Sequence, residues 1–106
     1  MPKYLFHGSY VGEGLKGLLK EGGSKRREAV EQAVNGMGGR LEGFYYAFGD
    51  DDVYAVADLP DNISSAALAL LINASGAVSI KTTVLLTPEE VDQAAKVSID
   101  YRPPGK

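Results

Sequence analysis

His7 is the only histidine of the chain, and imidazole is the side chain best suited to proton transfer near neutral pH. The residues around it alternate as in a β-strand, which places His7 and Ser9 on the same side. If that strand is central in an antiparallel sheet, strands containing Tyr54 and Lys81 lie beside it. We therefore predict a small-ligand site formed by His7, Ser9, Tyr54 and Lys81, where an imidazole, an ammonium and an aromatic wall meet.

Two alternatives to this site remain open at the level of sequence. Asp58 is the other residue that the third strand could contribute in place of Tyr54. The same side chains are also consistent with a polar sheet face whose hydrogen bonds are made across a subunit interface. In that case the residues stabilise an assembly and bind no ligand.

Other catalytic chemistries find little support. The absence of cysteine excludes disulfides, thiolate catalysis and Cys-based zinc sites. The serines lack a nucleophile-elbow motif, and the glycine-rich stretches lack the dinucleotide fingerprint. Asp50-Asp51-Asp52 does not have the alternating ligand spacing of a cation-binding loop, because consecutive side chains of a short turn diverge. We predict no catalytic residue, no metal site and no cofactor.

The elements that must position His7 follow from hydrophobic periodicity and turn residues. Strands are predicted over 3–10, 41–48, 53–59 and 78–86, and helices over 13–37, 63–73 and from Thr87 onward. Gly22-Gly23 interrupts the first helical region, and Ser24 is expected to cap its second half. The turn at Asp50-Asp51-Asp52 is expected to keep its carboxylates in water. Thr87 and Glu90 form a capping box around Pro88.

This order, β-α-β-β-α-β, predicts an α+β, ferredoxin-like domain with a four-stranded antiparallel sheet and helices on one face. A short C-terminal helix and an extended tail follow. The strands carry bulky apolar residues on both sides, Phe44, Tyr45 and Tyr46 among them. Because helices cover only one face, we expect a second copy to cover the other, giving a homodimer or a higher homo-oligomer.

Several stretches resemble the GYD-domain family, small bacterial proteins grouped with the dimeric α/β-barrel superfamily. The most specific are the segments 44–54 (FYYAFGDDDVY) and 58–62 (DLPDN). Gly49, Asp50 and Asp52 match the naming motif, whereas Asp51 stands where tyrosine is usual. The resemblance implies the ferredoxin-like fold and self-association, and it supplies no catalytic residues.

Length and charge bound the remaining possibilities. The 106 residues suffice for one domain, with a core over about 3–97 and a tail over 98–106. The net charge of −3 gives no basic surface for nucleic acid, and Lys25-Arg26-Arg27 fits a solvated helix surface. No signal peptide is recognisable and no apolar run is long enough to span a bilayer, so no membrane association and a cytoplasmic location are expected.

Three functions are consistent with these features. The first is a small oligomeric domain that binds a small ligand or a protein partner at the helix-free sheet face. The second is a cofactor-independent enzyme, similar to monooxygenases or isomerases of the dimeric α/β-barrel type, using His7 or Lys81. The third is a structural assembly subunit. The second rests on fold-level resemblance alone.

Overall fold

A computed structural model describes residues 1–106 and contains four strands and four helices. Their order along the chain is β1 (Lys3–Tyr10), α1 (Glu13–Glu21), α2 (Gly23–Gly36), β2 (Arg40–Tyr46), β3 (Val53–Asp58), α3 (Asn62–Ala74), β4 (Val78–Leu85) and α4 (Pro88–Ala95). None of the helices combines the length and the hydropathy needed to cross a membrane.

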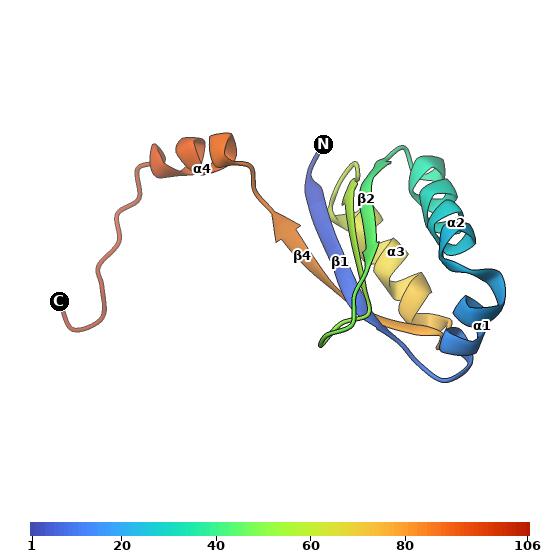
Figure 1. Ribbon diagram of the computed structural model, residues 1–106. Helices are drawn as coiled ribbons and strands as arrows, with labels where there is room; N and C mark the ends of the chain where they lie inside the picture. Colours follow the sequence, from blue (N-terminus) through green and yellow to red (C-terminus); the bar gives the residue numbers. More distant parts are fainter.

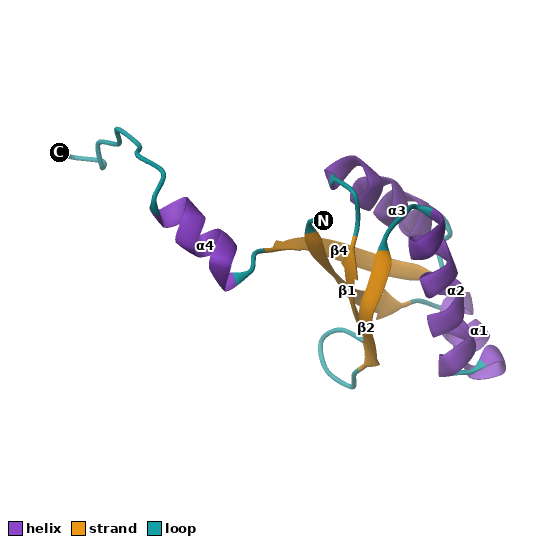
Figure 2. Cartoon of the chain, turned by 90° about the horizontal axis from the view of Figure 1, so that it is seen from above, coloured by secondary structure: helices purple, strands orange, loops and turns teal.

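The four strands form one sheet in the order β2-β3-β1-β4, and every neighbouring pair is antiparallel. Helices α2 and α3 cover one face of this sheet and leave the other free (Figures 1 and 2). The predicted ferredoxin-like arrangement is confirmed. Its most important consequence is that β1 is a central strand, so the first and the last strands of the chain lie side by side.

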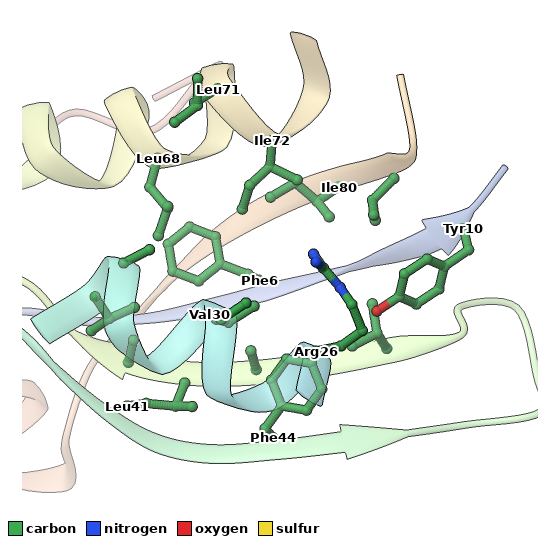
Figure 3. Close-up of a pocket in the computed structure, with 17 residues that line it drawn as sticks. Phe6, Tyr10, Arg26, Val30, Leu41, Phe44, Leu68, Leu71, Ile72 and Ile80 are labelled. Carbon is green, nitrogen blue, oxygen red and sulfur yellow. The ribbon is translucent and has the colours of Figure 1, made fainter. Parts of the chain in front are cut away.

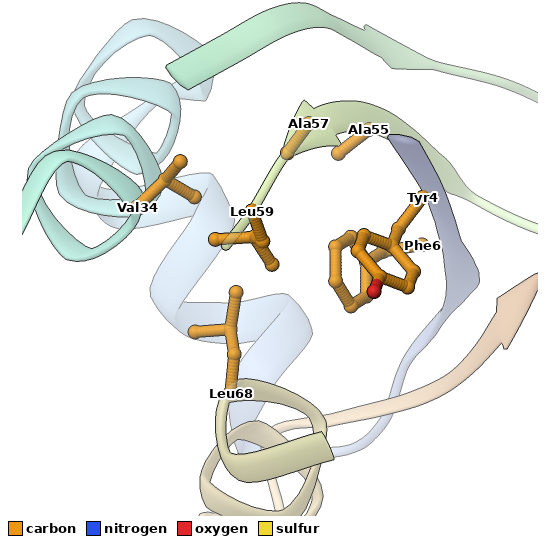
Figure 4. Packing of buried hydrophobic residues seen from close by; sticks show 7 residues of the cluster. All are labelled: Tyr4, Phe6, Val34, Ala55, Ala57, Leu59 and Leu68. Carbon is orange, nitrogen blue, oxygen red and sulfur yellow. The ribbon is translucent and has the colours of Figure 1, made fainter. Parts of the chain in front are cut away.

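The hydrophobic core lies between the sheet and the helices. Side chains of β1 and β3 alternate between buried and partly exposed, as expected for strands with one covered face. Seven buried residues form the central cluster shown in Figure 4: Tyr4, Phe6, Val34, Ala55, Ala57, Leu59 and Leu68. The buried hydroxyl of Tyr4 donates a hydrogen bond to Asn62 Oδ1 at 2.6 Å, so its burial leaves no polar group unpaired.

The first helix packs very closely on the start of β4. A Cβ atom at Gly14 would overlap the backbone carbonyl of Ala77, and the neighbouring Val11 amide donates to that same carbonyl at 3.0 Å. Only glycine fits at position 14 without a backbone shift. This contact anchors the entry to β4 and thereby the strand that carries Lys81.

The prediction that Ser24 caps the second helix is wrong. Helix α2 begins at Gly23, and Gly22 occupies the cap position with φ 90 and no side-chain hydrogen bond. The positive φ of Gly22 makes the turn between α1 and α2, which starts the helix one residue before Ser24. Ser24 therefore lies within the first turn.

Residues 86–106, which we call the arm, project away from the domain (Figures 1 and 2). The predicted capping box of α4 is present: Thr87 Oγ1 accepts from the Glu90 amide, and Glu90 Oε1 accepts from the Thr87 amide. No residue of α4 is buried, and no further helix or strand follows it. The molecule is consequently elongated, with extents of 57 × 33 × 23 Å.

Candidate functional site

The sheet register brings three predicted site residues to one level of the helix-free face. His7 is paired with Tyr54 on β3 and with Lys81 on β4. Ser9 lies two residues further along β1, opposite Ser79, and its hydroxyl donates to the Asp50 carbonyl at 3.4 Å. Asp58, the alternative to Tyr54, is paired with Lys3 at the other end of β1.

Two polar side chains and one aromatic ring hold the imidazole of His7. Its Nδ1 lies 2.8 Å from Asp51 Oδ2, and its Nε2 lies 3.4 Å from Thr83 Oγ1. The Tyr54 ring stacks nearly parallel to it, with centroids 6.0 Å apart and planes at 9°. Because a carboxylate only accepts hydrogen bonds, Asp51 favours the tautomer that carries its proton on Nδ1. Nε2 is then the acceptor nitrogen, and the Thr83 hydroxyl is positioned to donate to it.

The loop between β2 and β3 places the Asp51 side chain against the His7 imidazole. The Asp52 amide donates to the Gly8 carbonyl at 2.7 Å, and Asp52 Oδ2 accepts from the Tyr10 amide at 3.2 Å. These bonds fold the loop back onto the end of β1. The expectation that the turn carboxylates stay in water is therefore wrong for Asp51 and Asp52, which are partly buried and hydrogen-bonded.

Sequence reasoning missed Asp51 and Thr83. Thr83 could have been found, because it lies two residues after Lys81 in an alternating strand and so points to the same side. The only signal for Asp51 in the sequence is that it stands where the family usually has tyrosine. Its contact depends on the path of the loop, which periodicity does not specify.

Lys81 contributes an unpaired positive charge. Its side chain is exposed, and none of the ion pairs of the structure includes it. It therefore stands beside His7 and Thr83 without a carboxylate to neutralise it. Together these groups supply an ammonium, a hydroxyl and an oriented imidazole, a set that suits a small organic anion.

The opposite end of the same face is electrostatically satisfied. Lys3 Nζ binds Asp58 Oδ1 at 2.8 Å and also contacts the Glu42 carboxylate, while Arg40 Nη2 lies 3.4 Å from Asp58 Oδ2. The hydrogen bond from Lys3 lowers the pKa of Asp58, and the bonds to Asp58 and Glu42 raise the pKa of Lys3. These groups neutralise one another, so we assign them a structural role.

The main apolar cavity lies on the other side of the sheet, between α2, α3 and the strands (Figure 3). It measures about 170 Å³ and is lined by 17 residues, 16 of them hydrophobic, with Arg26 as the charged exception. None of the residues around His7 lines it. We regard this cavity as incompletely filled space in the core, because it lacks the convergent polar groups of a specific ligand site.

A second cavity lies near α1, and none of the residues around His7 lines it either. The face of a sheet is too flat to enclose a ligand by itself, so the His7 cluster needs a second layer to become a pocket. No group of three or more histidine, cysteine or acidic side chains that could hold a metal ion comes together in the structure.

Comparison with known proteins identifies the family. A family model described as GYD domain matches residues 4–95, which cover all the strands and helices described above except the first residue of β1. The match agrees with the resemblance noted in segments 44–54 and 58–62. No curated protein and no solved structure matches the chain.

Proposed function

The chain belongs to the GYD-domain family, and we propose that it is a homodimeric domain that binds a small organic anion at the helix-free sheet face. The observation that carries this proposal is the exposed ammonium of Lys81, which has no carboxylate partner within the chain. It lies beside His7, whose imidazole Asp51 fixes in place through a contact of 2.8 Å to Nδ1.

The two ends of the face differ in a way that favours ligand binding at the His7 end. Lys3, Asp58 and Arg40 satisfy one another within a single chain. Lys81 has no such partner, and an unpaired cation next to hydrogen-bonding groups is available for an external anion. A carboxylate reaching Lys81 would occupy the cationic donor that this end leaves unused.

The ligand needs an apolar part as well. Tyr45 is paired with Tyr54 across β2 and β3, and its side chain is 69% exposed. The Tyr54 ring stacked on His7, which Tyr45 extends on the outer strand, is an aromatic surface that suits an anion with a planar body. We therefore expect aromatic or similarly flat carboxylates to bind more tightly than acetate.

A second copy supplies the missing layer. Leu5, Val56 and Leu85 lie on the helix-free face and are only partly buried in a single chain. Covering this face with an identical one would bury these residues in one symmetric contact and would turn the flat His7 cluster into an enclosed site.

Proton transfer is the second candidate function, and the Asp51–His7 pair is the observation that favours it. A carboxylate that fixes the tautomer of an imidazole prepares the other ring nitrogen to act as a general base. An isomerase-like or monooxygenase-like reaction without a cofactor would use His7 in this way, with Lys81 stabilising the negative charge that develops on the substrate.

NMR titration of the dimer tests ligand binding. Benzoate should shift the imidazole resonances of His7 and the Thr83 amide saturably, and the neutral amide benzamide should not. Lys81→Gln should weaken benzoate binding at least about tenfold, the loss of one charge-assisted contact. Lys16→Gln is the matched control, because Lys16 is an exposed lysine on α1 far from this face, and it should change nothing. Absence of saturable shifts at about 10 mM benzoate would refute the proposal.

Hydrogen–deuterium exchange at carbon separates the two candidates. If His7 is a general base, a bound carbonyl compound with an acidic α-hydrogen should exchange it faster in D2O with the protein than without. Asp51→Asn should then slow the exchange more than it weakens binding. Equal rates with and without protein would leave binding as the function.

A further inference from the structure

The single chain exposes far more surface than its mass warrants. Its accessible area is 7488 Å², whereas a folded monomer of 11.3 kDa is expected to expose about 5,700 Å². The radius of gyration is 16.9 Å, against about 13 Å for a compact chain of this length. About 1,800 Å² per chain is therefore surface that a compact protein of this size would bury.

Five of the sixteen large apolar residues that the chain exposes lie in the arm. Its large apolar side chains are between 51% exposed, at Val91, and 76% exposed, at Ile99. Leu86, Val97 and Tyr101 lie between these values. Apolar residues recur through a segment in which nearly every residue faces solvent. Segments that stay free in solution are more commonly polar.

Helix α4 needs a surface to pack on. It has only eight residues, and helices of that length are marginal in water even when they are well capped. Val91, Ala94 and Ala95 form an apolar stripe at helical spacing, while Glu89 and Asp92 are polar. The body of its own chain does not cover this stripe, because the arm leaves β4 directed away from the domain (Figures 1 and 2).

We propose that two copies exchange arms, so that residues 86–106 of each lie across the helix-free sheet face of the other. That face offers the partly exposed apolar side chains of Leu5, Val56 and Leu85, which the uncovered apolar stripe of α4 can pack against. The excess surface of two chains amounts to about 3,600 Å², within the range that obligate dimers bury.

The exchange rests on the proposed function in one respect only, the use of the helix-free face as the interface. It adds that the cover over His7 includes the partner's arm as well as the partner's sheet. The site then contains residues of both copies, and neither copy completes it alone.

Cross-linking between introduced thiols tests where the arm lies. Because the chain contains no cysteine, each introduced thiol reports one position. Val97→Cys is prepared in a size-tagged chain and Ser79→Cys, on the helix-free face, in an untagged one. The two are mixed, allowed to exchange subunits and oxidised with diamide. A disulfide between the two sizes is expected.

The matched control replaces Ser79→Cys with Leu70→Cys, an exposed position on α3. This pair should give little mixed disulfide. Equal yields with Leu70→Cys and Ser79→Cys, or no mixed disulfide with Ser79→Cys, would overturn the arm exchange. Neither outcome depends on ligand binding, so failure here is distinguishable from failure of the proposed function.

Light scattering of the 106-residue chain provides the second test. Val91→Glu and Ile99→Glu alter side chains that are exposed in a single copy, so they should preserve the fold by circular dichroism. They should raise the dimer dissociation constant at least about 100-fold. Ile63→Glu, on an 80% exposed position of α3, should leave it unchanged. A wild-type monomer at high micromolar concentration, or dissociation constants unaffected by the arm variants, would overturn the inference.

Discussion

The carboxylate of Asp51 determines which nitrogen of His7 faces a ligand. Asparagine at this position can either donate or accept, so it no longer specifies the tautomer. The contact joins two partly exposed side chains, which limits its contribution to folding. Its effect should therefore be larger on binding than on stability.

Asp51→Asn should change the free energy of unfolding by less than about 1 kcal/mol and weaken benzoate binding several-fold. Nitrogen-15 chemical shifts of the imidazole should change from one dominant tautomer to a mixture. Asp50→Asn is the matched control, because Asp50 is the exposed neighbour in the same loop and has no side-chain contact with His7. Identical tautomer shifts in both variants would contradict the role of Asp51.

Asp58 should make folding sensitive to acid. Its pKa is lowered mainly by the hydrogen bond from Lys3, so the folded state favours the charged form. This contribution is complete above the ordinary carboxyl pKa of about 4 and is lost as the pH falls through the lowered folded value.

Urea unfolding at pH 7 and pH 3 measures this contribution. Asp58→Asn should destabilise the protein at pH 7 by about 1 kcal/mol and should reduce the difference between the two pH values. Asp92→Asn on α4 is the control, since Asp92 is exposed and forms no ion pair within the chain. An unchanged pH dependence in Asp58→Asn would show that other carboxylates cause the acid sensitivity.

Sequence alone predicted the side of the sheet on which His7 lies but not the residues that hold it. Strand alternation has a strict period of two, so the direction of His7 and Ser9 followed from their positions. The contact from Asp51 depends on backbone hydrogen bonds of a six-residue loop, which leave no periodic trace in the sequence. Whether these residues form a functional site stays a prediction.

At the level of elements, α1 approaches the start of β4 very closely at Gly14. The same helix contains Gly17, around which a Cβ would meet nothing within 4 Å. The two glycines therefore separate the effect of crowding from the effect of helix propensity.

Gly14→Ala should destabilise the protein by about 1–3 kcal/mol, because the new methyl group overlaps the Ala77 carbonyl and forces the backbone to move. Gly17→Ala should stabilise it by up to about 1 kcal/mol through better helix propensity. Urea denaturation measures both. Stabilisation by Gly14→Ala as large as that by Gly17→Ala would show that α1 is not packed tightly against β4.

The elements themselves were largely predictable, with small differences at their ends. The capping box at Thr87 and Glu90 gave the start of α4 correctly, because its chemistry is local. The predicted start of α2 was wrong, because the positive φ of Gly22 allows the turn to end before Ser24. Backbone conformations that only glycine adopts readily are not visible in hydrophobic periodicity.

At the scale of the whole molecule, arm exchange would make stability depend on protein concentration. A dimer is favoured by mass action, so the melting temperature should rise as the concentration increases. Calorimetry from low to high micromolar protein should show this rise for the wild type. It should be much smaller for Val91→Glu. A wild-type melting temperature independent of concentration would contradict a dimer held together by its arms.

The central position of β1 affects how the chain can fold as it is synthesised. Residues 3–10 are synthesised before every other strand and helix of the domain, but their partner strand, residues 78–85, is among the last of these elements to be made. Until β4 has been made, one edge of β1 carries unpaired backbone groups. The pairing of β1 with β4, which joins the strands farthest apart in the sequence, cannot form before then. A nascent chain stalled before residue 78 should therefore be a good substrate for chaperones that bind exposed strands.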